Sequence, residues 1–195
     1  MNTPRDPRAP QRALISTLLL SLVSSAPLSC GETQTQYLAL DRDFQGFLQW
    51  PQRALGSTTI AGHPAGPRVL YRRPNDQLPP WAGPSPDAGD DAGPPQFARG
   101  TILVKTVEVG PVTDWEIFAM VKRGGDYNHN GAVGWEFFSL KVLPSGAVIV
   151  VGRGLIPSAD RYTDPGTGQA LTCNQCHGTT AARARDSVLS EGLTP

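Results

Sequence analysis

Three residues near the carboxyl end of the chain have the types and spacing needed to hold a redox-active prosthetic group. Cys173, Cys176 and His177 lie in the segment Cys-Asn-Gln-Cys-His, which matches the C-x-x-C-H signature of covalent haem attachment. Two thiols three residues apart can reach the two vinyl groups of one porphyrin, and the imidazole that follows can bind the iron. The spacing therefore predicts one covalent c-type haem, with Cys173 and Cys176 as its thioether residues and His177 as the iron ligand.

Two other kinds of site share part of this signature. A structural zinc site needs four ligands, mostly Cys and His, but the other histidines, His63 and His129, do not stand at zinc-finger spacing. A thioredoxin-like C-x-x-C lies early in a βαβ unit, whereas this pair lies near the carboxyl end of the chain. Both alternatives fit less well than covalent haem.

The second axial ligand of the iron distinguishes an electron carrier from a ligand-binding haem protein. Electron-transfer cytochromes commonly use a His and a Met, yet no His or Met follows His177. Met120 falls in a strand-like run, where a core position is expected, and His63 and His129 fall in loop-like segments. We therefore expect an open iron position that can take a small ligand.

The amino-terminal segment has the features of a bacterial export signal. Arginines precede the apolar run 13–23, which is too short to span a bilayer, and small residues follow it. Ser29-Cys30 resembles the end of a lipobox, although Pro27 stands where leucine is usual. We expect a lipoprotein-type signal peptide at 1–29, lipidation of Cys30, and a periplasmic or cell-envelope location with the lipid as the only membrane anchor. Ordinary cleavage nearby, with Cys30 left as a thiol, is the alternative.

The rest of the chain, 30–195, is expected to form one domain. It is interrupted at 78–95 by a segment rich in Pro, Gly and Asp, which we expect to be a disordered surface insertion. The chain carries 17 basic and 17 acidic side chains, so its formal net charge is zero. This balance gives no reason to expect nucleic acid as a partner.

Hydrophobic patterning indicates an α+β fold: an antiparallel sheet with flanking helices and a C-terminal haem segment. Apolar residues recur at helical spacing over 37–48, and a second short helix is expected at 181–189. The segment 126–131 is expected to be a hairpin loop, and Pro144-Ser145-Gly146 a tight hairpin turn. Runs rich in β-branched and aromatic residues predict strands at 68–72, 100–109, 115–122, 135–142 and 147–151.

Four segments in this order, followed by C-x-x-C-H, resemble the cytochrome P-460 and cytochrome c′-beta family. They are RVLY at 68–71, FARGTILVK at 97–105, MVK at 120–122 and GWEF at 134–137. The resemblance covers roughly 37–195, apart from the insertion. It implies an antiparallel β fold with helices, a homodimer, and a five-coordinate haem whose proximal ligand would be His177.

The resemblance gives Lys105 an expected role. In cytochrome P-460 members the lysine at this position is bonded to the porphyrin edge, whereas cytochrome c′-beta members lack the bond. From the residues alone, Lys105 sits in an apolar strand on the face of Leu103 and Val107, where burial would favour a neutral, nucleophilic amine. The alternative is a lysine that extends from a strand edge to solvent.

Phe118 departs from the enzymatic members of the family. It stands where hydroxylamine-oxidising members carry a glutamate, a residue that can accept protons from the substrate. A phenyl ring cannot accept protons and would instead cap the distal side of the haem, as in cytochrome c′-beta. Glu116, on the same strand face, is the remaining candidate for a catalytic base. The simpler alternative is a carboxylate on the solvent side or at the strand edge.

These residues lead to one functional expectation and two alternatives. The first is an exported haem protein that binds nitric oxide or a similar small ligand. The second is an oxidoreductase of the cytochrome P-460 type that acts on hydroxylamine or nitric oxide, with another cytochrome as its redox partner. A periplasmic electron-transfer cytochrome is third, because no sixth ligand is evident.

Overall fold

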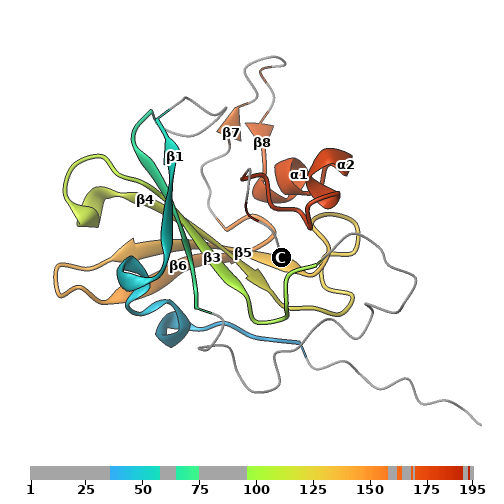
Figure 1. Ribbon diagram of the computed structural model, residues 1–195, viewed down its shortest axis with the longest axis horizontal. Coiled ribbons are helices and arrows are strands. Elements are labelled where there is room, and N and C mark those ends of the chain that lie inside the picture. Colours follow the sequence, from blue (N-terminus) through green and yellow to red (C-terminus); the bar gives the residue numbers. More distant parts are fainter. Residues whose placement is uncertain are drawn as a thin grey trace, which may run out of the picture. The chain divides into compact units, whose positions relative to one another are not determined.

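Segments rich in β-branched and aromatic residues build one antiparallel sheet. The computed structural model describes residues 36–57, 65–74, 96–157, 162–163, 168, 170–190 and 193, all of which belong to one compact unit, 33–195. The sheet has six strands in the order β1-β2-β3-β4-β5-β6, each antiparallel to its neighbours (Figure 1). The strands are β1 (Gln52–Gly56), β2 (Arg68–Arg72), β3 (Ile102–Val107), β4 (Glu116–Lys122), β5 (Trp135–Val142) and β6 (Val148–Gly154).

The other elements are short. Three 3-10 helices, two α-helices and a separate two-stranded pair complete the described structure. They are η1 (Asp41–Phe44), η2 (Phe47–Gln49), η4 (Val112–Asp114), β7 (Tyr162–Thr163), β8 (Ala170–Leu171), α1 (Cys173–His177) and α2 (Thr180–Arg183). The antiparallel sheet with a few short helices confirms the predicted α+β class.

The predicted strands are confirmed with small changes at their ends. Both hairpin connections are confirmed as well: 126–131 lies in the loop between β4 and β5, and Gly146 adopts a left-handed conformation in the turn before β6. The edge strand β1 was missed, because its side chains are almost all exposed and its sequence QRALG has no apolar alternation.

The predicted helix over 37–48 is wrong. Gly46 has a φ of 70°, a left-handed conformation that breaks the helical path between η1 and η2. The apolar spacing instead serves to bury Phe44 and Phe47 completely from two separate turns. Burial of the two rings, worth roughly 1.5–3 kcal/mol each, therefore comes without a regular helix.

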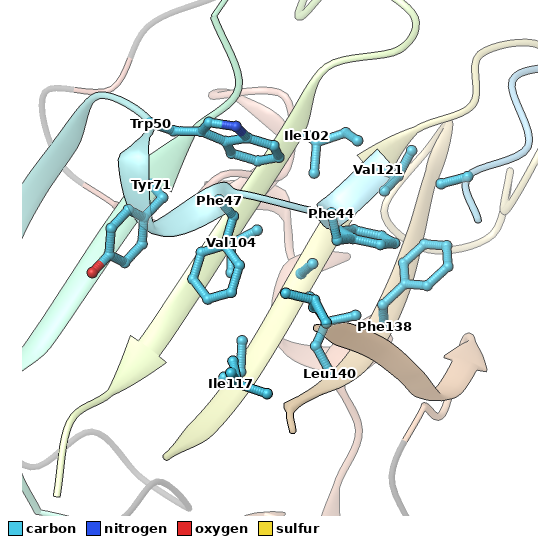
Figure 2. Close-up of a cluster of buried hydrophobic side chains, with 14 of the residues drawn as sticks. Phe44, Phe47, Trp50, Tyr71, Ile102, Val104, Ile117, Val121, Phe138 and Leu140 are labelled. Carbon is cyan, nitrogen blue, oxygen red and sulfur yellow. The ribbon is translucent and has the colours of Figure 1, made fainter. Parts of the chain in front are cut away.

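These two turns cover one face of the sheet. The Phe44 ring packs against Phe138 of β5 with their centroids 5.2 Å apart, and Phe47 meets Tyr71 of β2 edge-on at 5.3 Å (Figure 2). Every second residue of the central strands faces this cluster, which we call the η-face core. Its strand residues include Ile102, Val104, Ile117, Ala119, Val121, Phe138 and Leu140.

The alternate residues of the same strands form a second core on the opposite face, which we call the α-face. Leu70, Leu103, Trp135 and Phe137 are buried there, and Val188 from the carboxyl-terminal segment packs on them. Figure 1 shows η1 and η2 on one side of the sheet and the segment with α1 and α2 on the other. The α-face is therefore the surface on which C-x-x-C-H is placed.

The predicted helix over 181–189 is too long. The α-helix α2 ends at Arg183, and Asp186 and Ser187 have φ values of 48° and 64°. Such values are incompatible with a right-handed helix. The chain turns there because the Asp186 carboxylate is drawn into the α-face, where Lys122 binds it.

Four expectations fall on residues outside the described ranges: the signal peptide at 1–29, lipidation of Cys30, the insertion at 78–95, and the loop position of His63. Within the described ranges, no helix is long and apolar enough to cross a membrane.

Candidate functional site

Residues 173–177 form the short helix α1, and the local sequence explains why. Thr172 caps the helix: its Oγ1 accepts from the Gln175 backbone N–H at 3.2 Å, and the Gln175 side chain accepts from the Thr172 N–H at 2.8 Å. This reciprocal pair is a capping box. The helical turn brings the Cys173 and Cys176 side chains, three residues apart, to the same side of α1.

Both thiols are partly buried. Cys173 packs against the α-face core, and burial raises the pKa of its thiol to about 11. The thiol is therefore protonated at neutral pH in the haem-free chain, which protects it from thiolate oxidation. Cys173 and Cys176 form no disulfide with each other.

His177 is held in one tautomer and one orientation. Its Nδ1 lies 2.7 Å from the backbone oxygen of Ser187. A carbonyl oxygen can only accept a hydrogen bond, so Nδ1 carries the proton and the lone pair of the neutral ring is on Nε2. The ring also packs on Phe137 of β5, with centroids 5.3 Å apart. Protein ligands to haem iron and other metals are commonly fixed by this kind of hydrogen bond from the second nitrogen.

Asn174 attaches α1 to the loop between β4 and β5. Its Oδ1 accepts from the Asn128 side chain at 2.6 Å and from the Ala132 backbone N–H at 3.0 Å. Asn128 itself has a φ of 57° and also donates to the Ala132 and Trp135 carbonyls. A Cβ at Gly131 would overlap the Asn174 amide, so this close approach requires glycine.

Lys105 and Phe118 lie side by side on the α-face. The two residues are directly opposite each other in the antiparallel register of β3 and β4, which brings cross-strand Cβ atoms to about 5 Å. Leu103 and Val107, the expected neighbours of Lys105 along its strand, are both buried. The structure therefore brings together the lysine and the phenylalanine that the sequence analysis singled out.

Burial changes the protonation of Lys105. It lowers the pKa of the amine from its ordinary value of 10.5 to about 8, against an opposing attraction from Glu116. The Cys173 and Cys176 thiols and the buried Arg68 also interact electrostatically with the amine. Lys105 is thus near both thiols and carries a substantial neutral fraction at mildly alkaline pH.

The residues of β4 that face the α-face form a row. Lys122, Met120, Phe118 and Glu116 follow at every second position, about 7 Å apart. Met120 pairs with Phe137, the residue that contacts the His177 ring. Met120 therefore lies near the contact between Phe137 and His177, and it was expected to be a core residue. Phe118 and Glu116 lie progressively further from that contact along β4. His129 is exposed in the loop between β4 and β5.

Sequence reasoning missed the residues that hold the motif in place. These are Asn128 and Asn174, which fix α1, and Lys122, Asp186 and Ser187, which lie behind His177. One signal was available: Asp186 is an isolated acidic residue in a segment that otherwise carries Arg183, Arg185 and small residues.

The donor set can be compared with what different cofactors need. In the described part of the chain, no group of three or more His, Cys, Asp or Glu side chains could hold a metal ion. Two thiols on one side of a helical turn, followed by an imidazole with its lone pair on Nε2, fit a haem bound through thioethers and one axial histidine. Comparison of the chain with models of protein families, with curated proteins and with solved structures gives no significant match.

Proposed function

We propose that this chain is an exported c-type haem protein whose iron keeps one position open for nitric oxide or a similar small ligand. The observation that carries the proposal is the hydrogen bond from His177 Nδ1 to the Ser187 carbonyl, directly beside the two thiols of C-x-x-C-H. A histidine fixed in this tautomer offers Nε2 as a ligand. Haem bound there would supply an iron centre that takes up diatomic ligands and exchanges electrons.

The residues of the motif would hold the group without any oxidation. Each thiol, on Cys173 and on Cys176, would add across one vinyl group: the S–H bond and the vinyl π bond would be replaced by one S–C and one C–H bond. The protonated Cys173 thiol would carry the hydrogen for this addition. His177 would hold the iron from one side.

The position of Met120 supports an open second side. Met120 pairs with Phe137 in the register of β4 and β5 and is packed, partly buried, against the α-face core, which favours a packing role over iron ligation. Phe118, one step further along β4, is an apolar neighbour rather than a ligand.

A second candidate function is oxidation of hydroxylamine or nitric oxide, as in cytochrome P-460. Lys105 and Glu116 favour it, because an amine with a lowered pKa and a carboxylate lie on the same face of the sheet. A bond from the Lys105 amine to a porphyrin carbon would replace one N–H and one C–H bond by a C–N bond, which releases two electrons and two protons. The cross-link therefore needs a two-electron oxidant of the peroxide class. Phe118 counts against this function, since no carboxylate stands at its position.

Titration of the reduced, purified protein with nitric oxide tests the proposal. We expect one nitric oxide per haem and a change in the absorption spectrum at stoichiometric addition. Met120→Leu is the matched variant: it should leave both the spectrum and the titration unchanged, because Met120 packs, partly buried, against the α-face core. Two results together would contradict the proposal: the wild type binds no nitric oxide, and Met120→Leu changes the spectrum to that of an open iron position. They would show that Met120 is the sixth ligand of an electron carrier.

A further inference from the structure

A buried ion pair forms next to the residue that contacts His177, because Asp186 directly precedes Ser187 in the chain. Lys122 and Asp186 are only 3% and 8% exposed, and the Lys122 Nζ lies 2.5 Å from Asp186 Oδ1. The carboxylate also accepts from the Phe97 backbone N–H at 2.8 Å and from the Trp135 indole N–H at 3.3 Å. These three donors come from the sheet or from the segment that leads into β3, so the pair ties the carboxyl-terminal segment to the α-face.

The pair is one residue away from the hydrogen bond that orients the imidazole. Asp186 and Ser187 are consecutive, and both adopt left-handed backbone conformations, which cost free energy for residues other than glycine. The turn is closed by the Ser187 N–H, which donates to the Ala182 carbonyl at 2.7 Å. The Ser187 carbonyl, on the other side, accepts from His177 Nδ1. The position of that acceptor therefore depends on a turn that the Asp186 side chain anchors.

We propose that Lys122 and Asp186 are positioning residues for the iron ligand: their ion pair holds the Asp186–Ser187 turn so that the Ser187 carbonyl fixes His177 Nδ1. The inference rests on the proposed role of His177 as an iron ligand. A strong hydrogen bond from Nδ1–H makes Nε2 a better electron donor. The pair thereby keeps the iron's reduction potential low and the ring orientation constant.

The competing interpretation is that the pair only stabilises the fold. Loss of one partner leaves an uncompensated buried charge and is strongly destabilising, whereas replacement of both by neutral groups is often nearly neutral for stability. The double variant Lys122→Met with Asp186→Asn separates the two roles. Asn tolerates the left-handed conformation and can still accept from the Phe97 N–H, so the turn keeps this contact. Together with the ion pair, the variant loses the bonds from the Trp135 indole N–H and from Lys122 to the Val133 carbonyl.

The matched control is Glu136→Gln. Glu136 is a carboxylate of similar burial, 3% exposed, which binds Arg153 and Arg123. It neighbours Phe137 in β5, so its side chain points to the opposite face of the sheet from His177. The Glu136→Gln variant should therefore be less stable than the wild type, while the hydrogen bond of the His177 imidazole stays unchanged.

Two measurements test the inference. The first is the exchange rate of the His177 Nδ1 proton with solvent, read by nitrogen-15 NMR of the full chain, which needs no bound haem. The second is the reduction potential of the haem-loaded protein without nitric oxide. We expect the double variant to fold, to exchange this proton at least tenfold faster than the wild type, and to have a higher reduction potential. Glu136→Gln should match the wild type in both.

The outcomes separate this inference from the proposed function. Wild-type exchange and potential in a folded double variant would overturn the positioning role, whatever the protein does with nitric oxide. Equal shifts in Glu136→Gln would overturn it too, because the effect would then reflect general loosening. A haem protein that fails to bind nitric oxide but shows the expected shifts would contradict the proposed function and leave the positioning role supported.

Discussion

Lys105 of β3 lies directly opposite Phe118 of β4, so the residue across from this half-buried lysine is a phenyl ring rather than a carboxylate. The nearest acidic residue on that face of β4, Glu116, is one step further along the strand and opposes the effect of burial only in part. The pKa of Lys105 consequently falls to about 8. Burial is the main cause of this lowered pKa, and Glu116 opposes it.

The first prediction concerns the pH dependence of Lys105. The chain has lysines only at 105, 122 and 141, and Lys141 is exposed. In haem-free protein, labelling of Lys105 by a small amine reagent should rise with a midpoint near pH 8, because burial lowers the pKa of this amine. Site-resolved mass spectrometry after short labelling at a series of pH values measures this midpoint, with the exposed Lys141 as the internal standard for reagent access. A Lys105 midpoint near 10.5 would contradict the assigned burial effect.

The same pKa change predicts the direction of stability with pH. Between about pH 8 and 10.5 the folded state holds fewer protons on Lys105 than the unfolded state. The free energy of unfolding should therefore rise with pH across this window through this residue. The difference between wild type and Lys105→Met isolates that contribution: Lys105→Met should gain more stability at pH 7 than at pH 10.5, as denaturant titration can measure.

Phe118→Glu tests which function the α-face supports. A carboxylate directly opposite Lys105 should raise the pKa of the amine and provide a proton acceptor beside the iron ligand site. We expect hydroxylamine oxidation with an artificial electron acceptor to be weak in the wild type and higher in this variant. Phe118→Gln has similar size and polarity but no charge, and should remain inactive. Fast turnover by the wild type that Glu116→Gln abolishes would instead identify Glu116 as the base and favour the enzymatic function.

Gly131→Ala tests how α1 is attached. The new Cβ would overlap the Asn174 amide, which accepts two hydrogen bonds from the loop between β4 and β5. Loss of these bonds should cost about 1–3 kcal/mol per buried group left unsatisfied, and α1 should lose its fixed position. We expect a lower melting temperature and a smaller yield of haem-loaded protein. Gly146→Ala, strained in the turn before β6 but with open space around it, should lower the melting temperature and leave the haem yield unchanged.

The strands were predictable because their signal is local. Segments such as 115–122 and 135–142 alternate between two buried faces and carry aromatic and β-branched residues, so the pattern itself specifies extended structure. The same local reading failed at 37–48, where apolar residues at helical spacing are buried from two turns separated by Gly46. Spacing alone does not distinguish these cases, since a single left-handed residue decides between them.

The chemistry-bearing residues were predictable, but their support was not. C-x-x-C-H is contiguous, and Lys105 and Phe118 follow from their positions in neighbouring strands. Lys122 and Asp186, by contrast, are 64 residues apart, and no local pattern pairs a strand lysine with a turn aspartate. The left-handed turn at Asp186 and Ser187 is itself a consequence of that distant contact, which explains why the helix predicted over 181–189 ends early.

The mass of the denatured polypeptide tests the proposal most directly, because every functional expectation depends on covalent haem at Cys173 and Cys176. The chain should be produced with a c-type haem attachment system, unfolded in acid and measured intact. We expect one haem on the wild type, two thioether bonds mapped to the Cys173–His177 peptide, and loss of stable attachment in the Cys173→Ala, Cys176→Ala double variant. A wild-type polypeptide that carries no haem mass, with both thiols still open to alkylation, would contradict the proposal.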